Sequence, residues 1–333
     1  TLDRIRRIQV EEDFGVWKEY AYQAGIHPAV ISYLDIHRDH FYRMETSVDG
    51  RMFVTARGWE DLSQLLYAYE QLGKTADREV VGQYIQHWKT AKDFANYLEL
   101  FEKYKTDYQI DAVLEGQFEK FATDKLKLAS FDEKFSVVGL LLGRLGRAFY
   151  QYYEQDLYVN DLFEKLKRFK KDLDLGTVPS LAMKNRIQME QENLEKKQLA
   201  KQLTLPVEKE KRKMIHFLQS LVPAIEKGEQ EGMESAELFS CASMPFQKEV
   251  QAREEDIGKT KEKLENAFHF LKMAFGEGQE MVIFMTELNT NPYSVQFISE
   301  NGCDSYYKYN KKLLFEEEQM SILSELDSIE QDL

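Results

Sequence analysis

The nonapeptide Thr55-Ala56-Arg57-Gly58-Trp59-Glu60-Asp61-Leu62-Ser63 decides the fold of the first part of this chain. It closes a weakly alternating segment, residues 43–55, whose centre is Asp49-Gly50. An Asp-Gly pair in such a setting indicates a β-hairpin, because both residues tolerate the positive φ of a tight turn. Beyond the hairpin, apolar residues recur at helical spacing at Trp59, Leu62, Leu66 and Tyr69. We predict a hairpin that leads directly into an amphipathic helix, which ends at Gly73.

Helices are also predicted on both sides of this stretch. Gly25 ends one helix over residues 17–24, and Pro28 begins the next. Asp77 is a good N-cap for a helix over residues 78–93 or beyond. Helical structure is expected to continue from there to about residue 121.

The rest of the chain reads as long helices separated by breaks. The predicted helical segments are residues 132–172, 183–205, 264–275 and 322–333. Residues 281–287 fit either a strand or a buried helix by pattern alone, and we favour the helix. The predicted breaks are residues 176–179, the prolines Pro206 and Pro223 on either side of one helix, and a loop-like stretch at residues 228–245. The segment 183–205 is highly charged, with a thin apolar stripe at Ile187, Leu194 and Leu203. Such a stripe is typical of an exposed or coiled-coil-like helix.

The composition limits the classes of protein to consider. The 333 residues carry a formal net charge of -14, so general nucleic-acid binding is not expected, because phosphate backbones would be repelled. The chain has two cysteines, Cys241 and Cys303, too few for a disulfide framework, and a reducing, cytoplasmic location is expected. No apolar run approaches the roughly 18 residues that cross a bilayer, so we expect a soluble protein without a membrane span. The start at Thr1 suggests a cut inside a longer gene product or a processed end.

Arg57 is the first candidate functional residue. It lies at a predicted helix start, where the positive end of the helix dipole disfavours a cation. The position becomes useful if a triphosphate docks on the same surface, since a guanidinium binds phosphate oxygens bidentately. The alternative is an ordinary surface arginine.

Ala68 to Thr75, which ends in Gly73-Lys74-Thr75, fits a relaxed phosphate-loop pattern. A phosphate loop follows a β-strand, and its backbone amides converge on the phosphates. Here the preceding residues are good helix formers in register with Trp59 and Leu66, so we interpret Gly73 as a helix end. Gly258-Lys259-Thr260 is a weaker match, because Arg253 occupies the first position.

Three segments in order resemble the end of an AAA+ ATPase module of the MoxR type. They are Leu2-Asp3-Arg4-Ile5, the stretch from His27-Pro28 to Leu34, and Phe53-Val54-Thr55-Ala56-Arg57-Gly58-Trp59. In that family a Leu-Asp-Arg-Phe-like motif closes the core, and a His-Pro helix and a Thr/Ser-Pro-Arg-like segment follow in the lid. This chain departs from the pattern at Ile5 and Ala56, where the family has Phe and Pro. Glu277 to Leu288 and Asn301-Gly302-Cys303 resemble the helical tail of some bacterial ATPases of this type.

The resemblance implies a role for this chain within a larger enzyme. Arg57 would be the sensor-2 arginine, which reaches the nucleotide phosphates from the lid, and Arg4 would lie near the nucleotide or a neighbouring subunit. The parent protein would bind ATP and Mg²⁺, hydrolyse ATP as a homo-hexamer, and remodel or activate a partner, such as a protein with a von Willebrand A domain. The missing core domain would hold the catalytic residues, so none is expected within this chain.

The expected fold is therefore mainly α. A lid-like helical domain with one short β-hairpin occupies residues 1–115, together with the end of the core module. A helical region with an exposed charged helix spans residues 116–205, and a C-terminal helical region, bundle or coiled-coil-like, spans residues 206–333.

Other clusters have simpler interpretations. Histidine and aspartate side chains gather at Asp35, His37, Asp39 and His40, but no second ligand cluster is evident, so no metal site is predicted. A basic run at Lys165, Lys167, Arg168, Lys170 and Lys171 is typical of a solvated helix face, with a phosphate or partner patch as the alternative. Cys241 would need an activating base to act as a nucleophile, and the sequence indicates none.

Two further functions remain open beside the ATPase lid. The chain could be a non-enzymatic helical adaptor that binds protein partners through its apolar stripes. It could also be a regulatory domain that binds nucleotide without hydrolysing it.

Overall fold

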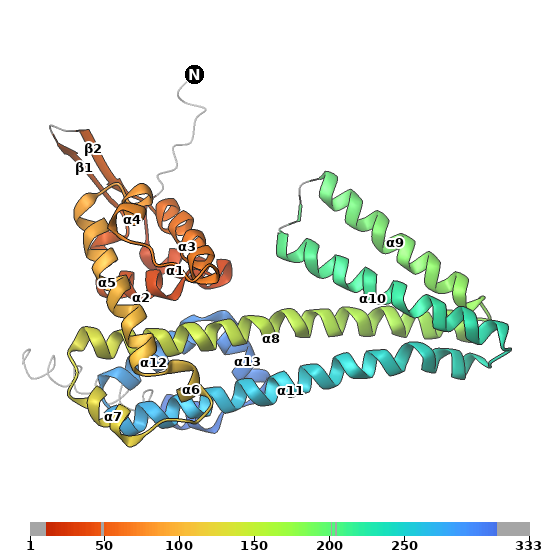
Figure 1. Cartoon of the computed structure of the whole chain (residues 1–333). Coiled ribbons are helices and arrows are strands. Elements are labelled where there is room, and N and C mark those ends of the chain that lie inside the picture. The colour runs from red at the N-terminus through yellow and green to blue at the C-terminus, as the bar shows by residue number, and fades with distance from the viewer. Residues whose placement is uncertain (1–10, 48–49, 201, 204, 312–333) are drawn as a thin grey trace, which may run out of the picture. The chain divides into compact units, whose positions relative to one another are not determined.

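The computed structural model describes residues 11–47, 50–200, 202–203 and 205–311, and it is mainly α with one short antiparallel hairpin (Figure 1). The strands are β1 (Arg43–Ser47) and β2 (Gly50–Val54). The helices of the first half are α1 (Phe14–Ala24), α2 (Pro28–Ile36), the 3₁₀ helix η2 (Arg38–His40), α3 (Ala56–Gln71), α4 (Arg78–Tyr84), α5 (Trp88–Asp107), α6 (Ile110–Leu114) and α7 (Lys120–Lys127). The helices that follow are α8 (Phe131–Asp174), α9 (Pro179–Leu199), α10 (Leu205–Gln230), α11 (Ser235–Phe275), α12 (Gln279–Thr290) and α13 (Pro292–Asn301). The predicted mainly α fold is confirmed.

Local sequence signals explain the ends of α1 and α2. Asp13 caps α1, since its Oδ1 accepts a hydrogen bond from the amide of Val16 at 3.0 Å. Gly25 ends α1 with a left-handed φ of 66°, which costs glycine little. Pro28 begins α2, where its missing amide hydrogen has no partner to lose. The predicted helix end at Gly25 and helix start at Pro28 are confirmed, whereas α1 begins at Phe14, before the predicted start at residue 17.

The hairpin connects directly to α3, as predicted. β1 and β2 pair antiparallel in a register that places Ser47 opposite Gly50. Of the predicted Asp49-Gly50 turn, Asp49 lies outside the described residues, and Gly50 is the first residue of β2 with a φ of 126°. Thr55 follows β2 and caps α3, so strand and helix are separated by a single residue.

The helix predicted over residues 78–93 is wrong in its extent. Asp77 caps α4 as expected, but α4 ends at Tyr84 and α5 begins at Trp88. Between them the backbone is extended, and Ile85 is fully buried. His87 caps α5 through Nδ1, which accepts from the amide of Thr90 at 3.3 Å. Burial of Ile85 and the histidine cap favour the break, although no glycine or proline marks it.

Two prolines that were predicted to interrupt helices lie inside them. α10 runs through Pro223, and α11 begins at Ser235 and runs through Pro245, so the loop predicted at residues 228–245 is confined to a short turn near Gly232. The charged helix predicted over residues 183–205 is α9, which ends at Leu199. The predicted helix over 281–287 is confirmed as α12, and the one predicted over 322–333 lies outside the described residues.

The chain divides into two compact units. The first unit comprises the described residues of Thr1–Phe149 and Thr260–Leu333, and the second comprises Tyr150–Lys259. The three ranges expected from the sequence do not coincide with these units, because α8 and α11 each contribute residues to both.

Aromatic side chains form much of the core of the first unit. Trp59, Tyr33 and Phe94 are almost fully buried, and their ring centroids lie 5.1 to 5.8 Å apart. α8 approaches α2 closely through two glycines. A Cβ at Gly139 would lie 2.7 Å from Cβ of Ser32, and a Cβ at Gly143 would overlap the ring of Pro28.

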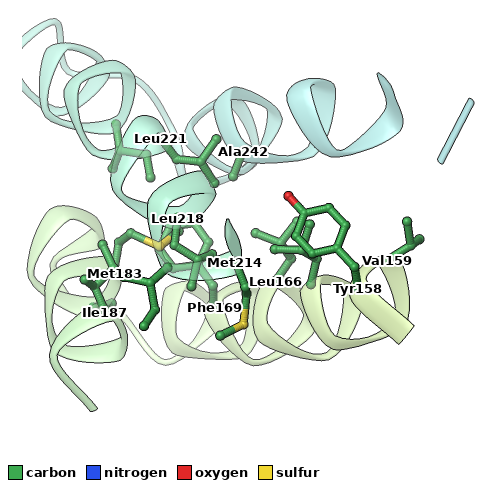
Figure 2. Packing of buried hydrophobic residues seen from close by; sticks show 14 of the residues in the cluster. Tyr158, Val159, Leu166, Phe169, Met183, Ile187, Met214, Leu218, Leu221 and Ala242 are labelled. Carbon is green, nitrogen blue, oxygen red and sulfur yellow. The ribbon is translucent and has the colours of Figure 1, made fainter. Parts of the chain in front are cut away.

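The second unit has a core of its own (Figure 2). It is formed by apolar side chains from α8, α9, α10 and α11, including Tyr158, Leu166, Phe169, Met183, Ile187, Met214, Leu218, Leu221 and Ala242. α9 and α10 pack along each other, and Ile187 and Leu194 of the predicted stripe are buried there. The apolar stripe of α9 therefore faces the core of the second unit and not the solvent. Within the described part of the chain, no helix has the length and apolar character needed to cross a membrane.

Candidate functional site

The first turn of α3 holds the candidate Arg57 in a defined backbone position. Oγ1 of Thr55 accepts a hydrogen bond from the amide of Gly58 at 3.2 Å. Gly58 lies against α4, because a Cβ there would come within 2.9 Å of the carbonyl oxygen of Tyr84. The indole of Trp59 is buried and donates to the carbonyl oxygen of Phe41 at 3.2 Å. The turn is thus fixed on both sides of Arg57 by groups that are themselves packed.

The side chain of Arg57 extends into solvent. It is 89% exposed, and its Nε lies 3.9 Å from Oδ2 of Asp61 one turn further along α3. An exposed pair at this spacing contributes about 0.5 kcal/mol or less. Most donors of the guanidinium are therefore available to another anion. Arg4, the second candidate nucleotide residue, lies outside the described residues.

Gly73-Lys74-Thr75 is the end of α3, as predicted, and not a phosphate loop. α3 is helical to Gln71, and Gly73 follows with a left-handed φ of 63°. The amide of Lys74 donates back to the carbonyl oxygen of Tyr69 at 2.9 Å, which satisfies the helix end. α3 has 16 residues, so Arg57 and Lys74 lie at opposite ends of a helix about 24 Å long. The structure does not bring the two candidates together.

A cavity of about 650 Å³ lies beside this helix end, between α3, the 72–77 connection and α5. Its apolar lining comes from Leu66, Ala76, Ala95 and Leu98, and its polar lining includes His27, Glu70, Lys74, Arg78, Glu99, Glu102 and Lys105. The lining contains both acidic and basic side chains, so its charge does not favour either anionic or cationic ligands.

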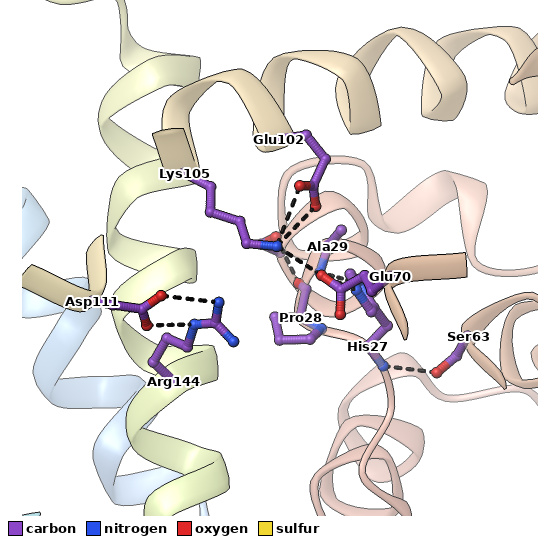
Figure 3. Close-up of polar contacts among 10 residues, drawn as sticks. His27, Pro28, Ala29, Ser63, Glu70, Glu102, Lys105, Asp111 and Arg144 are labelled. Carbon is purple, nitrogen blue, oxygen red and sulfur yellow. Dashed lines mark hydrogen bonds and ion pairs between the residues drawn. The ribbon is translucent and has the colours of Figure 1, made fainter. Parts of the chain in front are cut away.

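Four of the lining residues, His27, Glu70, Lys105 and Glu102, form a polar cluster (Figure 3). His27 is buried; its Nδ1 accepts from the amide of Ala29 at 3.2 Å, so the ring proton is on Nε2, which lies 3.6 Å from Oε1 of Glu70. Lys105 Nζ lies 2.8 Å from the same Glu70 oxygen and 3.2 Å from Oε2 of Glu102. His27, and after it Lys105, lowers the pKa of Glu70 to about 2.

This cluster joins elements rather than presenting reactive groups. The amide of His27 donates to Oγ of Ser63 at 2.8 Å, so the His-Pro segment is anchored to α3 as well as capping α2. Glu70 stays ionised at any pH near neutrality and is matched by Lys105. The arrangement ties α2, α3 and α5 together and offers no nucleophile.

The group considered as a metal site does not converge on one position, although Nε2 of His40 lies 3.6 Å from Oδ2 of Asp39. Nδ1 of His40 lies 2.6 Å from the hydroxyl of Tyr33, and the His40 ring stacks on His37 at 5.3 Å. Asp35 instead accepts from Lys18 at 2.6 Å. Among the described residues, no group of three or more histidine, cysteine or acidic side chains is arranged to hold a metal ion.

Two of the five residues of the basic run on α8, Lys165 and Lys167, lie beside acids. Lys165 Nζ lies 2.6 Å from Oε1 of Glu190, and Lys167 Nζ lies 3.5 Å from Oε1 of Glu164. Lys167, Arg168, Lys170 and Lys171 are exposed, which fits the interpretation as a solvated helix face, whereas Lys165 is half-buried.

Both cysteines are free, and each donates a hydrogen bond to an oxygen atom. Cys303 is buried, and burial together with Glu265 raises its pKa to about 12. Its Sγ donates to Oε1 of Glu265 at 3.1 Å. Cys241 is half-buried, and its Sγ donates to the carbonyl oxygen of Glu237 at 3.6 Å.

Sequence reasoning missed two charge clusters, because their members are far apart in the chain. One is the cluster of His27, Glu70, Glu102 and Lys105, and in the other Lys18 lies 2.6 Å from both Asp35 and Glu287. Lys18 and Glu287 are separated by 269 residues, and Glu70 and Lys105 by 35. No local spacing could have paired them.

Searches of protein-family models, curated proteins and solved structures found no match for this chain.

Proposed function

We propose that this chain is the lid and helical extension of a MoxR-type AAA+ ATPase, in which Arg57 binds nucleotide phosphates. The observation that carries the proposal is the exposure of Arg57 on a rigid helix start. Its guanidinium is 89% exposed and meets one carboxylate at 3.9 Å, while Thr55, Gly58 and Trp59 fix its backbone. A cation placed so against the helix dipole is suited to an anion brought by another domain.

The helix end at Gly73 supports the part of the proposal in which another domain holds the nucleotide and this chain supplies Arg57. The Gly73-Lys74-Thr75 match follows a helix, and so it lacks the strand that presents a phosphate loop. ATP and its Mg²⁺ would be held by a core domain outside this chain. Arg57 would supply charge stabilisation to the phosphates, the main contribution of protein groups in such enzymes. The hexameric ring and a partner with a von Willebrand A domain are proposed from the family resemblance alone.

The first test compares two arginines at helix starts. In the full-length gene product, Arg57→Ala should lower ATP turnover by about a hundredfold to a thousandfold, the range seen when one charge-stabilising donor is removed. Arg78→Ala is the matched control, because Arg78 is also exposed and begins α4. Circular dichroism of both variants checks that the helices are intact. Equal turnover in the Arg57→Ala variant and the parent would reject the assignment.

The second test uses the chain by itself. It should not hydrolyse ATP, because none of its described residues forms a phosphate loop in strand context. Phosphate release that is abolished by Lys74→Ala would overturn this view.

A helical adaptor is the second candidate function. It is favoured by exposed apolar side chains on α9, where Leu181 is 51% and Met189 62% exposed. An adaptor should bind its partner equally well with and without ATP, and equally well after Arg57→Ala. Binding that depends on both would favour the ATPase lid.

A further inference from the structure

Lys18 of α1 is a buried cation between two carboxylates. Its Nζ lies 2.6 Å from Oδ1 of Asp35 on α2 and 2.6 Å from Oε1 of Glu287 on α12. The hydroxyl of Tyr22, one turn further along α1, donates to Oε2 of Glu287 at 2.5 Å. Burial and the nearby carboxylate raise the pKa of Tyr22, so it keeps the proton that it donates. Both oxygens of Glu287 are therefore bound by α1.

The junction between α1 and α12 resists displacement because its charges are out of water. The side chains of Lys18, Asp35 and Glu287 are 8%, 10% and 13% exposed. Loss of one partner from such a cluster leaves another charge buried without compensation, which is strongly unfavourable. A shift of α1 along α12 would break two short charge-assisted hydrogen bonds at once.

The same helix α1 also contacts the start of α3. The hydroxyl of Tyr20, between Lys18 and Tyr22 in sequence, donates to Oε1 of Glu60 at 2.9 Å. Glu60 lies three residues after Arg57 on α3. The hydrogen bond thus connects α1 to the turn that carries the candidate arginine.

A second contact between α1 and α3 runs through aromatic side chains. The ring of Trp17 lies 5.0 Å from that of Phe41, centroid to centroid. The carbonyl oxygen of Phe41 accepts from the indole of Trp59 at 3.2 Å. Trp59 is fully buried two residues after Arg57, so this contact connects α1 to the backbone of that turn.

We propose that Glu287 is a positioning residue for Arg57. By holding Lys18 and Tyr22, it fixes α1, and α1 fixes the first turn of α3 through Tyr20 and Trp17. A partner that moves α12 would then change how the guanidinium is presented. The proposal rests on the proposed nucleotide role of Arg57, but the structural link can be measured without nucleotide.

The test is amide hydrogen exchange on the whole chain. Glu287→Gln should speed exchange by about tenfold or more in residues 14–24 and 56–62, because local opening becomes easier when the buried pair is broken. Exchange in α5, residues 88–107, should stay within about twofold. Tyr22→Phe removes a single hydrogen bond and should give the same pattern with a smaller amplitude, which keeps the test usable if Glu287→Gln folds poorly. Glu262→Gln, an exposed glutamate on α11, is the control and should change none of these segments.

The outcomes separate this proposal from the proposed function. Faster exchange in residues 14–24 with unchanged exchange in 56–62 would overturn the link from α1 to α3. In the full-length gene product, Glu287→Gln should lower ATP turnover when Arg57 is present and have no further effect in the Arg57→Ala background. Additive losses would show that Glu287 acts on stability alone. A confirmed link with unchanged turnover in Arg57→Ala would instead reject the proposed function.

Discussion

At the residue scale, the sequence could identify Arg57 but not the groups that hold its helix in place. Arg57 stands out because a cation at a helix start violates a local rule. The Gly73 helix end was equally readable, since it depends on neighbours within a few residues. From the sequence, His27 could be identified only as part of a His-Pro pair, because its partner Glu70 lies much later in the chain, near the end of α3.

The carboxyl group of Asp35 should make the stability of the protein depend on pH. Burial, and after it Glu287, raises the pKa of Asp35 to about 6, although Lys18 opposes the rise. Below about pH 4 the Asp35 carboxyl group is protonated in folded and unfolded chains alike. Above about pH 6 it is ionised in both, and folding then buries a charge, which is unfavourable. Its contribution to the free energy of unfolding therefore falls as the pH rises, by on the order of 3 kcal/mol in total.

Between pH 5 and pH 7, the parent should lose about 1 kcal/mol of stability that Asp35→Asn does not lose. Urea unfolding at both pH values measures the difference. The comparison cancels other titrating groups, including the histidines, because they are shared by the two proteins. Parallel pH profiles would contradict the assignment.

At the element scale, prolines were the least reliable guide to helix ends. Pro223 and Pro245 each lie inside a helix, although an interior proline costs about 3 kcal/mol. The neighbouring Leu221, Ile225 and Ala242 are buried in the core of the second unit, and burial of such side chains offsets a loss of that size. The opposite error occurred at Ile85, where tertiary burial ended a helix that local propensity would have continued.

The contact of α8 with α2 depends on the absence of a side chain at Gly143. Gly143→Ala should destabilise the first unit by about 1–3 kcal/mol, because the added methyl group overlaps Pro28. Gly258→Ala is the matched control, since Gly258 is also helical but has open space at its Cβ position. There the gain in helix propensity should stabilise the chain by up to about 1 kcal/mol. Thermal unfolding of both variants measures the contrast, and equal shifts would refute the close contact.

At the scale of the whole molecule, the order of residues in the chain differs from their grouping in space. The first unit is assembled from two separate segments, and Tyr150–Lys259 forms a second unit between them. The sequence-based ranges missed this because the helical pattern of α8 continues without a signal across residue 149. Composition and periodicity identify α8 as one long helix. Only the three-dimensional contacts show that its first part belongs to the first unit and its second part to the second unit.

The two cores should respond separately to truncation. Leu218→Ala in α10 should destabilise the second unit by about 2–5 kcal/mol and raise amide exchange mainly within residues 150–259. Leu62→Ala in α3 should have the converse effect, mainly within residues 14–107. Both leucines are fully buried, so the pair is matched in side chain and burial. If either variant loosened all segments equally, the units would unfold as one.

The buried pair of Lys18 and Glu287 also has a consequence for biosynthesis. The two residues are 269 positions apart, so at 5–20 residues per second a ribosome needs roughly 13–54 s to deliver the glutamate after the lysine. During that interval Lys18 has Asp35 as its carboxylate partner, and all of Tyr150–Lys259 emerges before α12 exists. The first unit therefore stays incomplete until α12 has been synthesised, whereas the second unit can already fold.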